Sequence, residues 1–154
     1  LAALKYGDLS NQASKDYIFD IDRFTSFEGN TGPYILYTIV RIKSILKRYE
    51  EMIGRVNENT TIRSYEIKSQ INLMLETTKF SEIIASAYEE HAPHKICKYV
   101  FDLSDAFNSF YHENKIIAEE DKKKQESWIS LIKLVLGVLE TCIDILGFEA
   151  PERM

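Results

Sequence analysis

The longest regular pattern in this sequence of 154 residues is an apolar stripe at helical spacing that follows a helix-capping signal. Asn30-Thr31-Gly32-Pro33 places a capping side chain ahead of a proline, and a proline in the first helical turn sacrifices no hydrogen bond. The stripe then recurs at steps of three and four: Ile35, Ile39, Ile42, Leu46, Tyr49, Ile53 and Val56. The pattern predicts a long amphipathic helix that begins at residues 30–33.

Three further segments predict helices between residues 65 and 114. Residues 65–90 have the apolar spacing of two shorter helices, with a break near residues 77–79. Pro93 opens the next helix, which ends near His112. Its apolar stripe comprises Ile96, Val100, Leu103, Phe107 and Phe110.

The two ends of the chain complete the prediction. After a charged connector at residues 119–124, a last helix is expected over residues 126–146, at the centre of a bundle because apolar residues cover most of its circumference. Residues 1–29 predict a helix followed by an aromatic and acidic loop. Only 6 glycines and 3 prolines are present, too few for the turns of many short strands. We therefore predict one all-α domain, a bundle of five or six helices spanning residues 1–154.

Net charge and cysteines restrict the function. A formal net charge of -5 argues against indiscriminate adhesion to nucleic acid or to an anionic membrane, so any site for a polyanion must be a local patch, and neither DNA nor a membrane is an expected partner. The run 128–148 contains charged residues that disfavour a membrane span. Cys97 and Cys142 lie in apolar helical stretches and are expected to be buried, reduced thiols of a cytoplasmic protein, with a disulfide as the alternative.

No sequence signature of catalysis is found. The nearest approach to a metal cluster is His91, His94 and Cys97, but Pro93 interrupts the helix that would bring them together. We expect a polar turn that leads to a buried cysteine, with a zinc site as the alternative. The lysines at residues 122–124 follow three acidic residues and are expected to lie in a solvated connector.

A second stripe runs along the long helix beside its apolar one. Its members are Tyr34, Tyr37, Arg41, Ser44 and Arg48. Within residues 41–55, five basic residues (Lys47 among them) outnumber two acidic ones, a balance of +3 in an acidic protein. Exposed tyrosine rings stack on unpaired bases, and arginine can hydrogen-bond a base edge or a phosphate. Single-stranded RNA binding is one interpretation, and an amphipathic helix with tyrosines at its core margin is the other.

Four blocks of the sequence resemble arginyl-tRNA synthetases, and they follow one another along the chain in the same order as in that family. Residues 27–42, with the Gly-Asn-Thr turn followed by Tyr34, Tyr37 and Arg41, resemble the start of that family's C-terminal helical domain. Residues 4–10 and 14–20 resemble the junction that follows the catalytic domain, residues 103–111 resemble a late helix, and residues 146–154 resemble a terminus that ends in Met. The chain opens without Met in a helical pattern, so we expect a piece of a longer protein.

The resemblance implies an anticodon-binding domain of the type named after an Asp-Ala-Leu-Arg motif. Residues 1–29 would be the junction and residues 30–154 the helical bundle. Tyr34, Tyr37 and Arg41 would line the pocket for the anticodon loop of arginine tRNA, Tyr111 would add a ring, and Met154 would close it. Lys47 and Arg48 are further tRNA-binding candidates.

The family's enzyme joins arginine to its tRNA, with ATP and Mg²⁺ serving an N-terminal catalytic domain of the same chain. No catalytic residue, metal or cofactor is therefore expected within these 154 residues. Alternative interpretations are a non-catalytic helical adaptor that binds arginine tRNA or a protein, and the matching domain of a neighbouring synthetase such as the cysteine enzyme.

Overall fold

The computed structural model describes residues 1–57 and 59–154, and within these residues the chain is helical and contains no strand. The elements are α1 (Ala2–Leu9), α2 (Ile21–Thr25), α3 (Gly32–Met52), α4 (Lys68–Thr78), α5 (Phe80–Glu89), α6 (Pro93–Glu113), the 3₁₀ turn η1 (Ile116–Ala118) and α7 (Lys122–Ile145). Six of the described helices have eight residues or more, which confirms the predicted all-α bundle.

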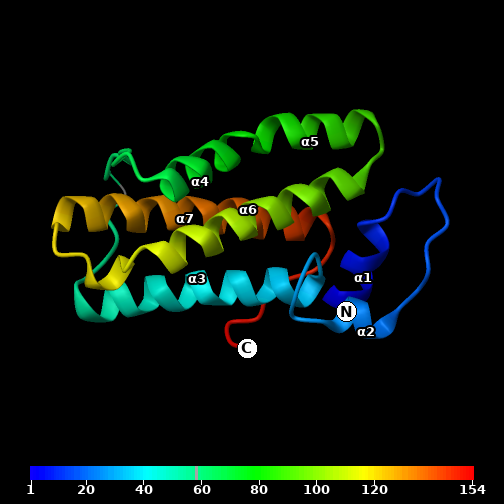
Figure 1. The fold of residues 1–154 in the computed structure, drawn as a ribbon, viewed down its shortest axis with the longest axis horizontal. Coiled ribbons are helices and arrows are strands. Elements are labelled where there is room, and N and C mark those ends of the chain that lie inside the picture. Colours follow the sequence, from blue (N-terminus) through cyan, green and yellow to red (C-terminus); the bar gives the residue numbers. More distant parts are fainter. Residues whose placement is uncertain (58) are drawn as a thin grey trace.

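The bundle is elongated, and α3, α6 and α7 run along its length (Figure 1). Helices α4 and α5 cover one side, while α1 and α2 lie at one end. The core forms where α3, α6 and α7 meet, because each contributes an apolar stripe. Fully buried side chains there include Ile35, Ile39, Ile42, Val100, Leu103, Phe107, Ile129, Ile132 and Val135. None of the described helices is long and apolar enough to cross a membrane.

The start of α3 follows the predicted capping signal, whereas its end does not follow the apolar stripe. Thr31 is the capping residue, and its hydroxyl accepts a hydrogen bond from the Tyr34 amide at 3.2 Å. The helix ends at Met52, ahead of Gly54, which has a φ of +129°. Ile53 is consequently 54% exposed, so its predicted place in the core stripe was wrong.

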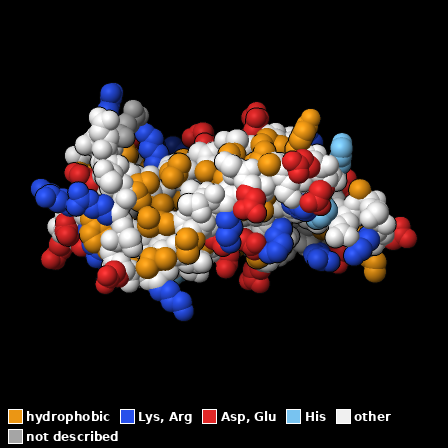
Figure 2. Space-filling model, turned by 90° about the horizontal axis from the view of Figure 1, so that it is seen from above, with side chains coloured by type: hydrophobic (Ala, Val, Ile, Leu, Met, Phe, Trp, Pro, Cys, Tyr) orange, Lys and Arg blue, Asp and Glu red, His pale blue; other side chains and the backbone are white. Residues whose placement is uncertain are grey.

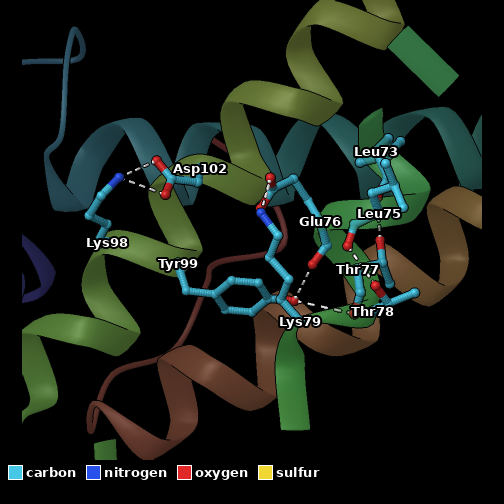
Figure 3. A network of polar contacts seen from close by, with 9 residues as sticks. All are labelled: Leu73, Leu75, Glu76, Thr77, Thr78, Lys79, Lys98, Tyr99 and Asp102. Atoms are coloured by element: carbon cyan, nitrogen blue, oxygen red, sulfur yellow. Dashed lines mark hydrogen bonds and ion pairs between the residues drawn. The ribbon is translucent and has the colours of Figure 1, made fainter. Parts of the chain in front are cut away.

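The side chain of Tyr99 on α6 contacts the chain at the predicted break between α4 and α5 (Figure 3). Tyr99 is buried, and its hydroxyl donates to the carbonyl of Glu76 at 3.1 Å, with the carbonyl of Thr77 at 3.5 Å. These carbonyls lie in the last turn of α4, where helix carbonyls lack an amide donor from the next turn of the same helix. Lys79 separates the two helices and forms an ion pair with Glu76 at 2.6 Å. The break therefore lies within the predicted residues 77–79.

The amino-terminal helix joins the bundle through close contacts. Tyr6 is fully buried and its hydroxyl donates to the carbonyl of Cys97 on α6 at 2.7 Å. Gly32 allows α1 to approach α3, since a Cβ there would lie 2.6 Å from the carbonyl oxygen of Ala2. Residues 16–20 form the expected loop, but α2 was not predicted; Asp20 caps it by accepting from the Arg23 amide.

The last helix begins earlier than expected. Asp121 caps α7 by accepting hydrogen bonds from the amides of Lys123 and Lys124, so the predicted connector contains the first turn of the helix. Lys124 also forms an ion pair with Glu119 at 2.9 Å. The apolar residues of α7 are not all in the core, because Leu134 and Ile145 are exposed.

Removing the Tyr99 hydroxyl tests how α4, α5 and α6 are joined. We expect Tyr99→Phe to lower the free energy of unfolding by about 1 kcal/mol, because carbonyls at the end of α4 lose their donor. Urea denaturation measures the change. Tyr88→Phe is the matched control, since Tyr88 is 84% exposed on α5 and should have no effect. Equal stabilities of both variants would contradict a structural role for the Tyr99 hydroxyl.

Candidate nucleic-acid interface

The guanidinium of Arg41 lies against two tyrosine rings on the surface of the bundle. Its central carbon is 4.7 Å from the ring centroid of Tyr37, one turn earlier on α3, and 5.2 Å from that of Tyr111 on α6. Tyr37 is 43% exposed and Tyr111 is 36% exposed. Two helices that are distant in sequence thus bring three of the predicted residues together, and none of the three is sealed inside the core.

A buried amide orients this arrangement from below. Asn108 of α6 is only 8% exposed, and its carbonyl oxygen accepts a hydrogen bond from Arg41 Nη1 at 2.6 Å. Its amide nitrogen donates to the Tyr34 hydroxyl at 2.9 Å and to the Thr38 hydroxyl at 3.0 Å. The three bonds place one α6 side chain in contact with three α3 side chains. Buried polar groups of this kind define a single side-chain geometry when all are satisfied.

Sequence reasoning missed Asn108, although one signal pointed to it. Asn108 is a polar residue beside the apolar stripe of α6, and it is buried. A carboxamide at the margin of a core face requires hydrogen-bond partners, which a neighbouring helix can supply. The partners could not be identified from the sequence, because pairing depends on how α3 and α6 cross.

Tyr34 supports the site and is less open than we expected. It is half-buried, its ring lies 5.7 Å from that of Phe101, and its hydroxyl accepts the Asn108 hydrogen bond. Burial raises the pKa of Tyr34 above its ordinary value, while the Asn108 hydrogen bond and the Arg41 charge act in the opposite direction. The phenol therefore stays neutral and available as a hydrogen-bonding group at physiological pH.

The remaining predicted residues lie farther along the same helix or in the terminal tail. Lys47 and Arg48 are exposed on the last turns of α3. The tail passes beside α3, since Glu152 forms an ion pair with Lys43 at 3.1 Å. Met154 is exposed at its end, close in sequence to Arg153, which lines a groove with Lys47 and Arg48. Closure of the site by Met154 stays a prediction.

Two grooves flank the carboxyl-terminal half of α3 and share Ser44 and Arg48. One, of about 550 Å³, lies toward α6 and η1 and includes Arg41 and Tyr111 in its lining. The other, of about 700 Å³, lies toward the terminal tail and includes Lys43, Lys47 and Glu51. The aromatic and arginine arrangement therefore opens directly into the first groove.

The zinc alternative has no support in the structure. Cys97 and Cys142 are both free and fully buried, and burial raises the pKa of each thiol to about 12. His91 lies in the turn before α6 with a φ of +50°. Across residues 1–57 and 59–154, no group of three or more His, Cys, Asp or Glu side chains could hold a metal ion.

The family described as DALR anticodon binding domain matches residues 35–154. The chain belongs to that family.

Its relatives are named arginine–tRNA ligases. The enzyme of Agathobacter rectalis is 63% identical over 155 residues, and that of Alkaliphilus oremlandii is 53% identical over 154 residues. Each alignment covers 100% of this chain and 26% of the relative, so the chain spans about a quarter of the length of these relatives.

Solved structures agree with this assignment. The arginyl-tRNA synthetase of Thermus thermophilus superposes with a TM-score of 0.88 at 28% identity, and that of Plasmodium falciparum with 0.84 at 29% identity. Both superpositions cover 99% of this chain and 26% of the other. The expected resemblance to the anticodon-binding domain of arginyl-tRNA synthetases is confirmed.

Replacing Asn108 tests whether one amide links α3 to α6. We expect Asn108→Leu to lower the free energy of unfolding by about 1–3 kcal/mol, because the Arg41, Tyr34 and Thr38 groups lose a buried partner. Thermal and urea unfolding measure the loss. Ser109→Ala is the control, since Ser109 is the exposed neighbour on α6. A stability of Asn108→Leu equal to that of the control would refute the linking role.

Proposed function

We propose that this chain is the part of an arginine–tRNA ligase that binds the anticodon loop of arginine tRNA. The observation that carries the proposal is the Arg41 guanidinium beside two exposed tyrosine rings, oriented by Asn108. Family membership and the names of the relatives support the same interpretation.

The chemistry of the Arg41 arrangement suits an unpaired base. A guanidinium has five N–H donors, and Asn108 accepts from Nη1, which leaves donors for a base edge or a phosphate. The exposed parts of Tyr37 and Tyr111 offer ring surface for stacking, which contributes about 1–3 kcal/mol per base. Because the arginine is oriented before RNA arrives, little side-chain freedom is lost on binding.

Selectivity would arise from the same oriented donors. A base whose acceptors do not match them would leave buried hydrogen-bonding groups without partners, and each such loss costs about 1–3 kcal/mol. A site built to hydrogen-bond its substrate rejects the wrong partner more strongly than an apolar pocket does. We assign this discrimination to the central anticodon base.

The rest of the ligase would perform the chemistry. In the proposed parent enzyme, an N-terminal catalytic domain uses ATP with Mg²⁺ to attach arginine to the acceptor end of the tRNA. This chain would bind the opposite end of the same tRNA and thereby position the acceptor end. No aminoacylation is expected from these 154 residues alone, and the cytoplasmic location expected from the sequence stays a prediction.

A non-catalytic adaptor is the second candidate. Aromatic residues and arginine are also enriched among the residues that dominate protein–protein contacts, so the Tyr37 and Arg41 surface could bind a protein. Salt dependence separates the two candidates. RNA binding weakens steeply as salt rises because counterions are released, whereas a contact centred on aromatic rings changes little.

The central anticodon letter provides the direct test. We expect the chain to bind an arginine tRNA transcript more tightly than the same transcript with that letter changed, by about 10-fold or more, because mismatched donors lose their partners. Fluorescence anisotropy titrations of both transcripts measure the ratio. Equal affinities would refute selective anticodon binding, and no binding at low salt would refute the proposed function.

Removing a ring tests the stacking surface. We expect Tyr37→Ala to weaken binding of arginine tRNA by about 1–3 kcal/mol, because an exposed stacking ring is lost. Tyr88→Ala is the matched control, as an exposed tyrosine on α5 outside the site. Lys47→Ala should reduce affinity evenly for every anticodon, as expected of a phosphate contact. Wild-type affinity of Tyr37→Ala would exclude this ring from the interface.

A further inference from the structure

A groove lies beside the Arg41 arrangement. It lies between the last turns of α3 and the turn that joins α6 to η1, and its volume is about 550 Å³. Arg41 and Tyr111 belong both to this groove and to the aromatic arrangement. A nucleotide whose base lies at Tyr37 and Tyr111 would thus have its neighbour at the mouth of this groove.

The charges lining this groove are all positive. Arg41, Arg48 and Lys115 contribute to its lining, and no Asp or Glu does. Arg48 and Lys115 are exposed, and among the described residues neither side chain forms an ion pair or a hydrogen bond. Cations that converge without a carboxylate partner create a local positive potential in a protein of net charge -5.

The second groove differs in this respect. Its lysines already have partners: Lys43 pairs with Glu140 at 3.0 Å and with Glu152 at 3.1 Å, and Lys47 lies 3.9 Å from Glu51. An anion entering there would compete with carboxylates of the protein itself. The first groove is therefore the better anion site of the two.

The floor of the first groove is apolar. Ile45 of α3 and Ile116 of η1 are buried beneath it, and Ile117 and Ala118 add to its lining. The cationic rim suits the anionic phosphates of a ribose-phosphate backbone, and the apolar floor suits the C–H groups of its ribose rings. A free inorganic anion would use only the rim.

The broad hydrophobic surface over α4 does not have this combination. Figure 2 shows apolar side chains gathered there, and the adjoining pockets are lined mainly by residues such as Ile62, Leu134 and Val138. Nothing in the structure indicates what covers that surface, whereas the groove at Lys115 is continuous with the proposed anticodon site.

We propose that the groove between α3 and η1 binds the ribose-phosphate backbone of the nucleotide next to the stacked base, with Arg48 and Lys115 as its phosphate contacts. This inference rests on the proposed function, because it requires RNA at the Arg41 arrangement. It adds Lys115, which lies outside the long helix, to the interface. The RNA strand would then pass across α3 and leave over η1.

The test uses an arginine anticodon stem-loop, titrated over a series of salt concentrations against wild type, the double variant Arg48→Ala/Lys115→Ala, and Lys15→Ala. Lys15 is an exposed lysine in the loop between α1 and α2, which lie at the opposite end of the bundle. Its replacement by alanine removes one positive charge away from the groove and serves as the control. A second set of stem-loops carries a neutral methylphosphonate at one loop phosphate at a time.

We expect the double variant to reduce the slope of log affinity against log salt by about 1.4, or about 0.7 for each single-strand phosphate contact. If the two affinities converge at 1 M salt, the double variant should bind roughly 25-fold more weakly than wild type at 0.1 M salt, because the slope difference then acts over one decade of salt concentration. Lys15→Ala should stay close to wild type, and the preference for the central anticodon letter should be unchanged. A methylphosphonate at either of the two phosphates that flank this nucleotide should weaken binding by wild type without weakening binding by the double variant further.

The outcomes separate the two proposals. A wild-type chain that does not bind the stem-loop overturns both of them. Selective binding by wild type combined with an unchanged salt slope in the double variant overturns the groove alone. The groove proposal is also overturned if Lys15→Ala loses as much affinity per removed charge as the double variant does. The same holds if every methylphosphonate weakens binding by wild type and by the double variant equally.

Discussion

The site depends on one carboxamide between two helices. Asn108 lies at the interface of α6 with α3, where its three hydrogen bonds reach Arg41, Tyr34 and Thr38. A buried amide can satisfy these groups only in one relative position of the two helices, since each bond has a fixed direction. The same contact that links the helices therefore orients the arginine on the surface.

Packing beneath this contact sets the spacing of the two rings. Tyr37 belongs to α3 and Tyr111 to α6, so the distance between them is determined by how the apolar stripes of these helices interdigitate. Phe107 is buried one turn before Tyr111 and its ring stacks on that tyrosine at 6.1 Å. The core thereby limits the freedom of an exposed ring, and a preorganised surface binds with a smaller entropy loss.

Charge is distributed unequally along α3. Lys43 pairs with Glu140 and Glu152, and Lys47 lies near Glu51 of the same helix. Arg48 has no carboxylate partner within the described residues, and it lines, together with Lys115, the groove that has no acidic lining. A paired lysine binds an incoming polyanion less strongly than an unpaired cation does, because binding would first require loss of an existing ion pair. An acidic protein can in this way present a local positive surface.

The sequence by itself determined the helices, because apolar spacing and capping residues act locally. The starts of α3 and α6 and the break at residues 77–79 follow from Thr31, Pro93 and the change of apolar phase. The end of α3 did not follow, since Gly54 ends the helix before the stripe does. Tertiary structure alone decided that Asn108 orients Arg41 and that Lys115 lines the same groove as Arg48, because these residues come together only through the packing of α6 and η1 against α3.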